Sequence, residues 1–388
     1  MEKRKGPIGK DDGSWIVIST IVGHIAYAKG NDRRRFLDDA AKMAAELFDP
    51  AALAYGCEFD PPKVDRTSSV AMLRLLAEKI ERAGTLNLAT SLLEGMAHVL
   101  PADSVNSGRV LAQRARISWK MGKTDLAQAR YQHLRRKARA LKSNELLIRA
   151  SAGFVALSQL RGNYPELRSW SRRVVTLAER CRYVRLAGLG HTGLMLGEAA
   201  AQRYNEATPH AWAAYQCREG DVRGQTESLN NIAQLFYDSG HHAVARDTFI
   251  RVLASRPVPY VAAAAVGGYA LSSAVLGDER AVRWAAAEAT SLSEILDHKY
   301  ESVTSLIECA TALDIVADQP YASVLRARAA AMAQYAGFFE LVHKADESAR
   351  RVPQTARGSF RGPASEVASS LSGLPAVALP DCLELSAV

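Results

Sequence analysis

The sequence repeats a turn signal at intervals of 37 to 41 residues, and this period constrains the fold more than any other feature. The repeated turn positions are Gly84, Gly122, Gly162, Gln202, Gly240, Gly277 and Asp318. A period in this range marks a solenoid of helical hairpins, in which each hairpin buries its apolar face against its neighbours. We therefore look for function on an extended surface rather than in a deep pocket.

Small or modest side chains recur at fixed distances from these turns and set the register of the hairpins. Seven residues before each turn stand Ala77, Ala115, Val155, Met195, Ala233, Ala270 and Thr311. Five residues after each turn stand Ala89, Ala127, Leu167, Ala207, Ala245, Val282 and Ser323. Small side chains allow two antiparallel helices to approach closely, so we expect these positions to face each other where the helices of each hairpin cross.

One copy of the repeat, "NNIAQLFYDSGHHAVARDTFIRVLASRP" over residues 230–257, carries a family resemblance. Its resemblance to the tetratricopeptide repeat rests on Leu229, Ile232, Ala233, Phe236, Gly240, Ala245, Phe249 and Pro257. The resemblance covers roughly residues 66–345, with a longer period and more degenerate copies than the family norm. It implies an all-α protein, a right-handed α-α superhelical solenoid of about seven helical hairpins.

Composition agrees with an all-α fold and indicates how the chain is divided. Hydrophobic residues make up 48% of the sequence, aromatic residues 7%, and alternating β-branched runs are essentially absent. We expect a flexible N-terminus over 1–12, a capping hairpin and loop over 13–65, and the solenoid over 66–349. The segment 350–388 is rich in Pro, Ser, Gly and Ala without apolar periodicity, so we expect a disordered tail.

The sequence offers no constellation that indicates catalysis, a metal site or a cofactor. His241 and His242 are adjacent and fall in a repeat turn, where polar side chains are expected, and no third ligand stands at a suitable spacing. The five cysteines form no paired motif and are interpreted as free thiols. We expect a protein without enzymatic activity.

Charge is concentrated in one segment of the chain. Between Arg109 and Arg185 there are 19 Lys and Arg against four acids, although the whole chain carries a net charge of +8. Most of these cations fall on the second helices of hairpins, and one interpretation is that they only form a solvated face of the protein. Five residues of the first helices fall at spacings that face the concave groove in the resembled family: Arg109, Arg116, Trp119, Lys120 and Arg149. Cations beside an aromatic ring favour an acidic peptide, and nucleic acid is the alternative partner.

A second candidate binding set lies in the best-preserved copy. It consists of Asn230, Asn231, Gln234 and Tyr237 on the expected first helix. Side-chain amides carry donors and acceptors, so they can pair with a peptide backbone of any sequence. In the resembled family an Asn at the place of Asn231 commonly does this; the alternative is that Asn231 satisfies neighbouring backbone within the array.

The function expected from these features is a peptide-binding or protein-binding module in the cytoplasm. The chain is similar to the repeat region of bacterial regulators that sense peptides or partner proteins, and "NDRRRFLDDAAKMAAELFDP" resembles stretches that follow the DNA-binding domain of actinobacterial-type regulators. The segment before it is too short for a helix-turn-helix, so direct operator binding is not expected. The basic start and the apolar run "WIVISTIVGHIAYA" leave secretion as an alternative. Asp11, Asp12 and His24 argue against a signal peptide, and the helical spacing of the apolar residues favours a packing helix. We expect no membrane partner, and the sequence does not set the oligomeric state.

Overall fold

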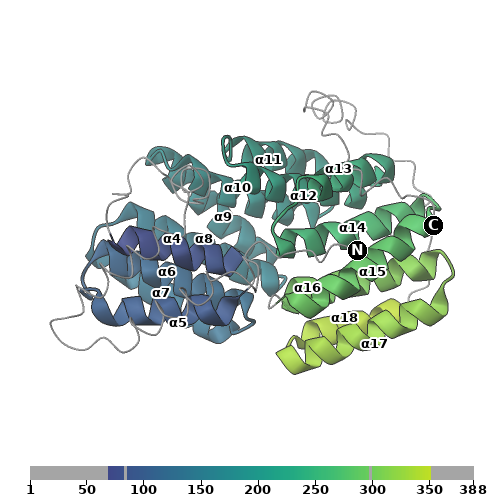
Figure 1. Ribbon diagram of the computed structural model, residues 1–388. Coiled ribbons are helices and arrows are strands. Elements are labelled where there is room, and N and C mark those ends of the chain that lie inside the picture. The colour runs from purple at the N-terminus through teal and green to yellow at the C-terminus, as the bar shows by residue number, and fades with distance from the viewer. Residues whose placement is uncertain (1–68, 83–84, 297–298, 351–388) are drawn as a thin grey trace. The chain divides into compact units, whose positions relative to one another are not determined.

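The computed structural model describes residues 69–82, 85–296 and 299–350. These ranges hold fifteen α-helices and no strand, which confirms the all-α prediction (Figure 1). The expected N-terminus and capping hairpin, and the expected tail beyond Arg350, lie outside the described residues. The chain divides into two compact units, Met1–Gly190 and His191–Val388, which we call unit 1 and unit 2 and describe separately.

Unit 1 contains three helical hairpins and the beginning of a fourth. Its helices are α4 (Ser69–Arg82), α5 (Leu86–Val99), α6 (Val105–Lys120), α7 (Thr124–Ala140), α8 (Asn144–Leu160), α9 (Tyr164–Arg180) and the first part of α10 (Val184–Ala199). Within each hairpin the two helices pack against each other, and the first helices α4, α6 and α8 also contact one another in sequence. Two apolar clusters fill the space between them, one around Leu76 and Leu93 and one around Tyr131 and Leu146.

Unit 2 continues the same arrangement. Its helices after α10 are α11 (Tyr204–Gln216), α12 (Val222–Asp238), α13 (His242–Ala254), α14 (Pro259–Val275), α15 (Glu279–Ile295), α16 (Lys299–Ile315), α17 (Gln319–Ala336) and α18 (Phe339–Arg350). The first helices α12, α14, α16 and α18 contact one another in sequence, and one apolar cluster extends from Met195 to Ala345. The described helices from α4 to α17 thus form seven hairpins, as the period predicts, and α18 follows as a single helix.

The hairpin turns use the left-handed backbone conformation that the recurring glycines permit. Gly122 has a φ of 75° and Gly240 a φ of 84°, a region where a residue with a Cβ is strained. Gln202 occupies the same conformation, with a φ of 58°, at the turn predicted for it. The seventh turn differs from the prediction, because the left-handed residue is Ala317 (φ 63°), whereas Asp318 is the N-cap of α17.

This one-residue shift also corrects the crossing positions of the seventh hairpin. Counted from Ala317, they are Ala310 and Ala322, both fully buried, instead of the expected Thr311 and Ser323. Aspartate is favoured both in turns and at helix N-caps, so the sequence alone did not show which of the two positions Asp318 occupies. In the six preceding hairpins, all of the predicted crossing residues are buried. The register is therefore as predicted in six hairpins and shifted by one in the last.

None of the described helices is both long and apolar enough to cross a bilayer.

Candidate functional site

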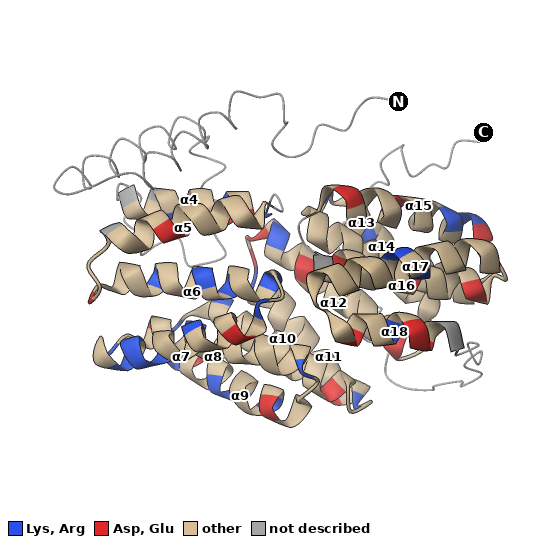
Figure 2. Ribbon diagram, turned by 90° about the horizontal axis from the view of Figure 1, so that it is seen from below, with Lys and Arg blue, Asp and Glu red and all other residues tan. Residues whose placement is uncertain are grey.

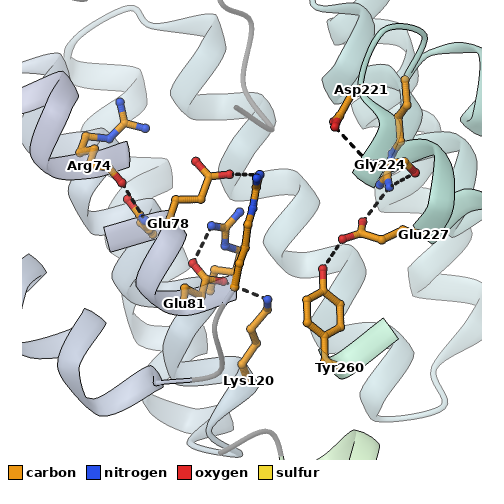
Figure 3. Close-up of polar contacts among 12 residues, drawn as sticks. Arg74, Glu78, Glu81, Lys120, Asp221, Gly224, Glu227 and Tyr260 are labelled. Carbon is orange, nitrogen blue, oxygen red and sulfur yellow. Dashed lines mark hydrogen bonds and ion pairs between the residues drawn. The ribbon is translucent and has the colours of Figure 1, made fainter. Parts of the chain in front are cut away.

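Charged side chains of three successive repeats meet on the first helices of unit 1. Helical spacing places residues three, four and seven apart on one face, so α4, α6 and α8 each carry a stripe of such side chains. We call this set the α4–α8 charge network: Arg74, Glu78, Glu81, Arg82, Arg109, Arg116, Lys120, Glu145 and Arg149. Figure 2 shows Lys and Arg recurring along α6 and α7, and Figure 3 shows the contacts around α4.

Glu145 on α8 is held between two of the predicted site residues. Arg109 on α6 donates to both of its oxygens, from Nε to Oε1 at 3.0 Å and from Nη2 to Oε2 at 2.7 Å, and Arg149 donates from Nε to Oε1 at 2.9 Å. Burial alone would raise the pKa of Glu145, but the hydrogen bonds and charges of the two arginines outweigh it and hold the pKa at about 2. The carboxylate is therefore ionised and ties α6 to α8.

Glu81 on α4 anchors the other two predicted cations. Its side chain is 1% exposed, and its oxygens lie 2.7 Å from Arg116 Nη2 and 3.0 Å from Lys120 Nζ. Glu78, one turn earlier, pairs with Arg82 on the same helix. A buried carboxylate needs such partners, because removing one of them leaves an uncompensated charge. These contacts join α4 to α6 across the repeat boundary.

Arg74 on α4 is the cation of the network that makes no ion pair among the described residues. Within the described part of the chain its guanidinium makes no hydrogen bond or ion pair, its buried Nε included; only its backbone carbonyl accepts a bond, from Gln113 Nε2 at 3.4 Å. In Figure 3 no dashed line reaches the guanidinium. Burial first, and then the charges of Arg149 and Arg109, lower the pKa of Arg74 to about 9, against the opposing charges of Glu78 and Glu145. Neighbouring positive charge therefore acts on this guanidinium more strongly than negative charge does.

The network as a whole is cationic. It contains six cationic side chains and three carboxylates, and all three carboxylates are engaged in ion pairs within the network. Partial burial reduces the screening of these charges by water. The face therefore favours an anionic group, and Arg74 is the one cation of the network that makes no ion pair among the described residues.

Trp119, the aromatic member of the predicted set, has a different environment. It packs against the apolar cluster of α6–α8 that contains Ala115, Tyr131 and Leu134. Trp119 is partly buried there. The structure thus brings four of the five predicted residues of unit 1 into the charge network and packs Trp119 against this apolar cluster.

The second predicted set lies on α12 in unit 2. Asn230 and Asn231 are half-buried, and neither side chain makes a hydrogen bond within the described residues; Oδ1 of Asn230 is fully buried in this state. Gln234 donates from Nε2 to Asp238 Oδ1 at 2.9 Å, and Tyr237 packs on the ring of His242 at 5.1 Å. The four residues therefore share one part of α12, with two amides available and the other two engaged.

Sequence reasoning missed an acidic group beside this set. Glu308 on α16 lies so close to Gly267 on α14 that a Cβ on that glycine would stand 2.1 Å from its Oε2. Burial, and to a smaller extent Asp238, raise the pKa of Glu308 to about 7, against the opposing charge of Lys344 on α18. Burial, Glu308 and Asp238 also raise the pKa of Tyr237 to about 12. Residues of α12, α14, α16 and α18 therefore lie around the carboxyl group of Glu308.

A second buried charge in unit 2 holds the start of α12. Arg218 donates from Nη1 to the carbonyl of Gly224 at 2.9 Å and to Glu227 Oε2 at 2.8 Å, and Tyr260 on α14 donates to the other oxygen of Glu227 (Figure 3). Asp221 caps the helix by accepting from the Gly224 N–H at 3.1 Å. Every charged group of this cluster has a partner, so we assign it to the stability of the hairpin.

Arg74, Glu81 and Glu145 were not among the residues predicted from sequence, although a signal exists for the two glutamates. The inter-helix pairs Arg109–Glu145 and Arg116–Glu81 are 36 and 35 residues apart, close to one repeat. Opposite charges at a spacing near the period fall on adjacent first helices. This signal identifies pairs, but it does not identify a cation that lacks one.

Comparisons with known proteins support the fold. No family model matches the chain, and no curated protein matches it in sequence. A crystal structure of Rap protein complexed with competence and sporulation factor is similar, with a TM-score of 0.52 and 12% identity, over 92% of this chain and 98% of that chain. A designed circular tandem repeat protein matches with a TM-score of 0.21 and 15% identity over 92% of this chain and 98% of its own. The likeness to Rap protein is one of fold, and the chain is an all-helical repeat protein similar to tetratricopeptide-repeat solenoids.

Proposed function

We propose that this chain is a non-enzymatic module, regulatory or scaffolding, that binds a peptide or a partner segment along the first helices of its repeats. The observation that carries the proposal is the α4–α8 charge network. Three repeats place six cations and three carboxylates on one partly buried face, which gives an acidic segment a long run of favourable potential. Arg109, Arg116, Lys120 and Arg149 are the contact residues proposed in unit 1.

The amides of unit 2 supply a different kind of contact. Asn230 and Asn231 make no side-chain hydrogen bond in the described structure, although both are half-buried. Oδ1 of Asn230 is buried without a hydrogen-bond donor, and a buried acceptor without a partner is costly unless a ligand satisfies it. We propose that they pair with the backbone of an extended peptide, with Gln234 and Tyr237 beside them. The Rap protein of similar fold was crystallised with competence and sporulation factor, which supports a ligand on such a fold.

Selection from a library of random peptides on the immobilised full-length chain tests this function. The enriched peptides are synthesised, and their affinities are measured by fluorescence anisotropy at two salt concentrations. We expect saturable binding of acidic sequences, weakened when their Asp and Glu are replaced by Asn and Gln. A library that yields no saturable ligand would contradict the proposal.

Variants of the paired cations need neutral rather than acidic replacements. Arg116 and Lys120 both contact Glu81, so a glutamate at either position would face a carboxylate that is 1% exposed. Such a variant would lose stability and binding together. Arg116→Met keeps the apolar stem and leaves Glu81 paired with Lys120, and is therefore the informative substitution.

A nucleic-acid-binding function is the second candidate, and it is favoured by the second helices of unit 1. Arg135 on α7 and Arg173 on α9 lie over the ring of Trp170, at 5.3 and 5.7 Å from its centroid. Burial, then Arg139 and Arg173, lower the pKa of Arg135, so these charges are not neutralised locally. Affinity for an oligonucleotide that falls steeply with salt, without saturable peptide binding, would favour this function.

A further inference from the structure

One repeat position of the first helices of unit 1 explains why Arg74 makes no ion pair with the neighbouring first helix. Ten residues before the turns at 84, 122 and 162 stand Arg74, Ala112 and Ala152, on α4, α6 and α8. The two alanines offer no carboxylate to the arginine on the neighbouring helix. Glutamates stand at other positions of the face, and each of them is already paired with another cation.

Arg74 does not relieve this situation by losing its proton at neutral pH. Even with a pKa lowered to about 9, its guanidinium remains charged there, whereas a buried carboxyl or amine can become neutral. The Nε of Arg74 is buried without an acceptor, and a buried donor without a partner costs free energy. Anionic oxygens of a ligand would satisfy this guanidinium and balance the charges of Arg149 and Arg109 that act on it.

We propose that Arg74, together with Arg109 and Arg149, forms a binding site for an anionic group of the ligand, a carboxylate or a phosphate. Arg74 donates to the anion through its free fork of N–H groups, which suits two oxygens of one group. Arg109 and Arg149 remain bound to Glu145 and add positive potential at the site. This inference rests on the proposed function, because it assigns the point at which an acidic ligand is anchored.

Small anions test the site without any knowledge of the full ligand. Glutarate serves as the carboxylate probe and inorganic phosphate as the phosphate probe, each titrated into the full-length chain at constant ionic strength set with sodium chloride. Binding is measured by isothermal calorimetry and by the shift of the melting temperature. The variants are Arg74→Met and the control Arg136→Met, which removes the same charge from an exposed position on α7.

We expect the wild-type chain to bind at least one of the two anions saturably. Arg74→Met should weaken that binding at least tenfold, and Arg136→Met should change it less than twofold. The preferred anion then identifies the group: glutarate indicates a carboxylate of the ligand, and phosphate indicates a phosphoryl group. No saturable binding to the wild type, or an equal loss in both variants, would overturn the site.

Stability without any anion gives an independent readout. The backbone carbonyl of Arg74, which accepts from Gln113, is unchanged in Arg74→Met, so the variant should melt at or above the wild-type temperature at low ionic strength. A markedly lower melting temperature would mean that the charge is stabilised within the fold, and would overturn the proposal.

The outcomes for the site and for the proposed function are distinguishable. If the wild-type chain and Arg74→Met bind selected peptides equally well, the site at Arg74 is contradicted and the peptide-binding function stands. If the chain binds anions through Arg74 but binds no peptide, the site stands and the peptide-binding function is contradicted.

Discussion

At the scale of single residues, two partly buried charges of this protein behave differently because of their chemistry. Glu308 in unit 2 can become neutral by taking up a proton, and its pKa of about 7 means that it does so near neutral pH. Arg74 in unit 1, with a pKa of about 9, stays charged at neutral pH in a site that disfavours its charge. The first group should make stability depend on pH, and the second should make binding depend on an anion.

Glu308→Gln should flatten the dependence of stability on pH. The folded pKa of Glu308 is raised from 4.5 to about 7 by burial and Asp238, so folding favours its protonated form. Its stabilising contribution is complete below pH 4.5 and is lost as the pH rises through 7. The variant should therefore be more stable than the wild type at pH 8, by roughly 1–3 kcal/mol, with little difference at pH 5.

Thermal melts of both chains between pH 5 and 8 check this prediction. Lys344, Asp238 and Tyr237 face the same group and remain present in both proteins. Glu219→Gln, at an exposed position, is the matched control. Identical pH profiles for wild type and Glu308→Gln would show that Glu308 does not titrate in this range.

Asn231→Ala should weaken binding of a selected peptide by about 1–3 kcal/mol, the loss from leaving a buried polar group of the ligand without a partner. The side chain of Asn231 makes no hydrogen bond in the described structure, so the melting temperature should change little. Calorimetry on the variant provides both values. Unchanged affinity with a lower melting temperature would make Asn231 a structural residue.

At the scale of the helices, the crossing points decide how closely each hairpin packs. Ala233 on α12 and Ala245 on α13 are fully buried, whereas Ala243 is exposed two residues away. Ala245→Leu should force the helices apart and reduce the free energy of unfolding by roughly 1–3 kcal/mol, and Ala243→Leu should change it little. Urea unfolding of the two variants measures the difference, and equal stabilities would contradict the assigned register.

The hairpins could be predicted from sequence because each one depends on local signals that recur. A turn residue and two small residues at fixed distances repeat, and helical hairpins require these features wherever they stack. The seventh turn was misplaced because Ala317 adopts the left-handed conformation without being glycine. The sequence grouped Trp119 with the cations because neighbouring helical positions can face either the groove or the packed interior, and the structure packs Trp119 against an apolar cluster.

The site was less predictable because it depends on pairing between repeats. Arg109, Arg116, Lys120 and Arg149 could be recognised as cations on first helices. Their neutralisation by Glu145 and Glu81 depends on side-chain geometry across helix interfaces. Arg74 can be distinguished only when these pairs are known, because it is the cation of the network that makes no ion pair among the described residues.

At the scale of the whole molecule, charge distinguishes two faces of unit 1. The segment from Arg109 to Arg185 carries 19 cations and four acids. Some of the cations belong to the α4–α8 charge network on the first helices, and others lie on the exposed sides of α7 and α9, such as Arg136 and Arg172. A peptide ligand is expected on the former face, and a polyanion attracted by charge alone would bind the latter.

Hydrogen–deuterium exchange of the full-length chain, with and without a selected acidic peptide, tests the central claim most directly. Binding suppresses local opening of the helices that contact the ligand, so it slows exchange there. We predict slower exchange over residues 69–82, 105–120 and 144–160, which form α4, α6 and α8, and unchanged exchange over α7 and α9. Protection confined to α7 and α9, or no protection at saturating peptide, would contradict binding on the first helices.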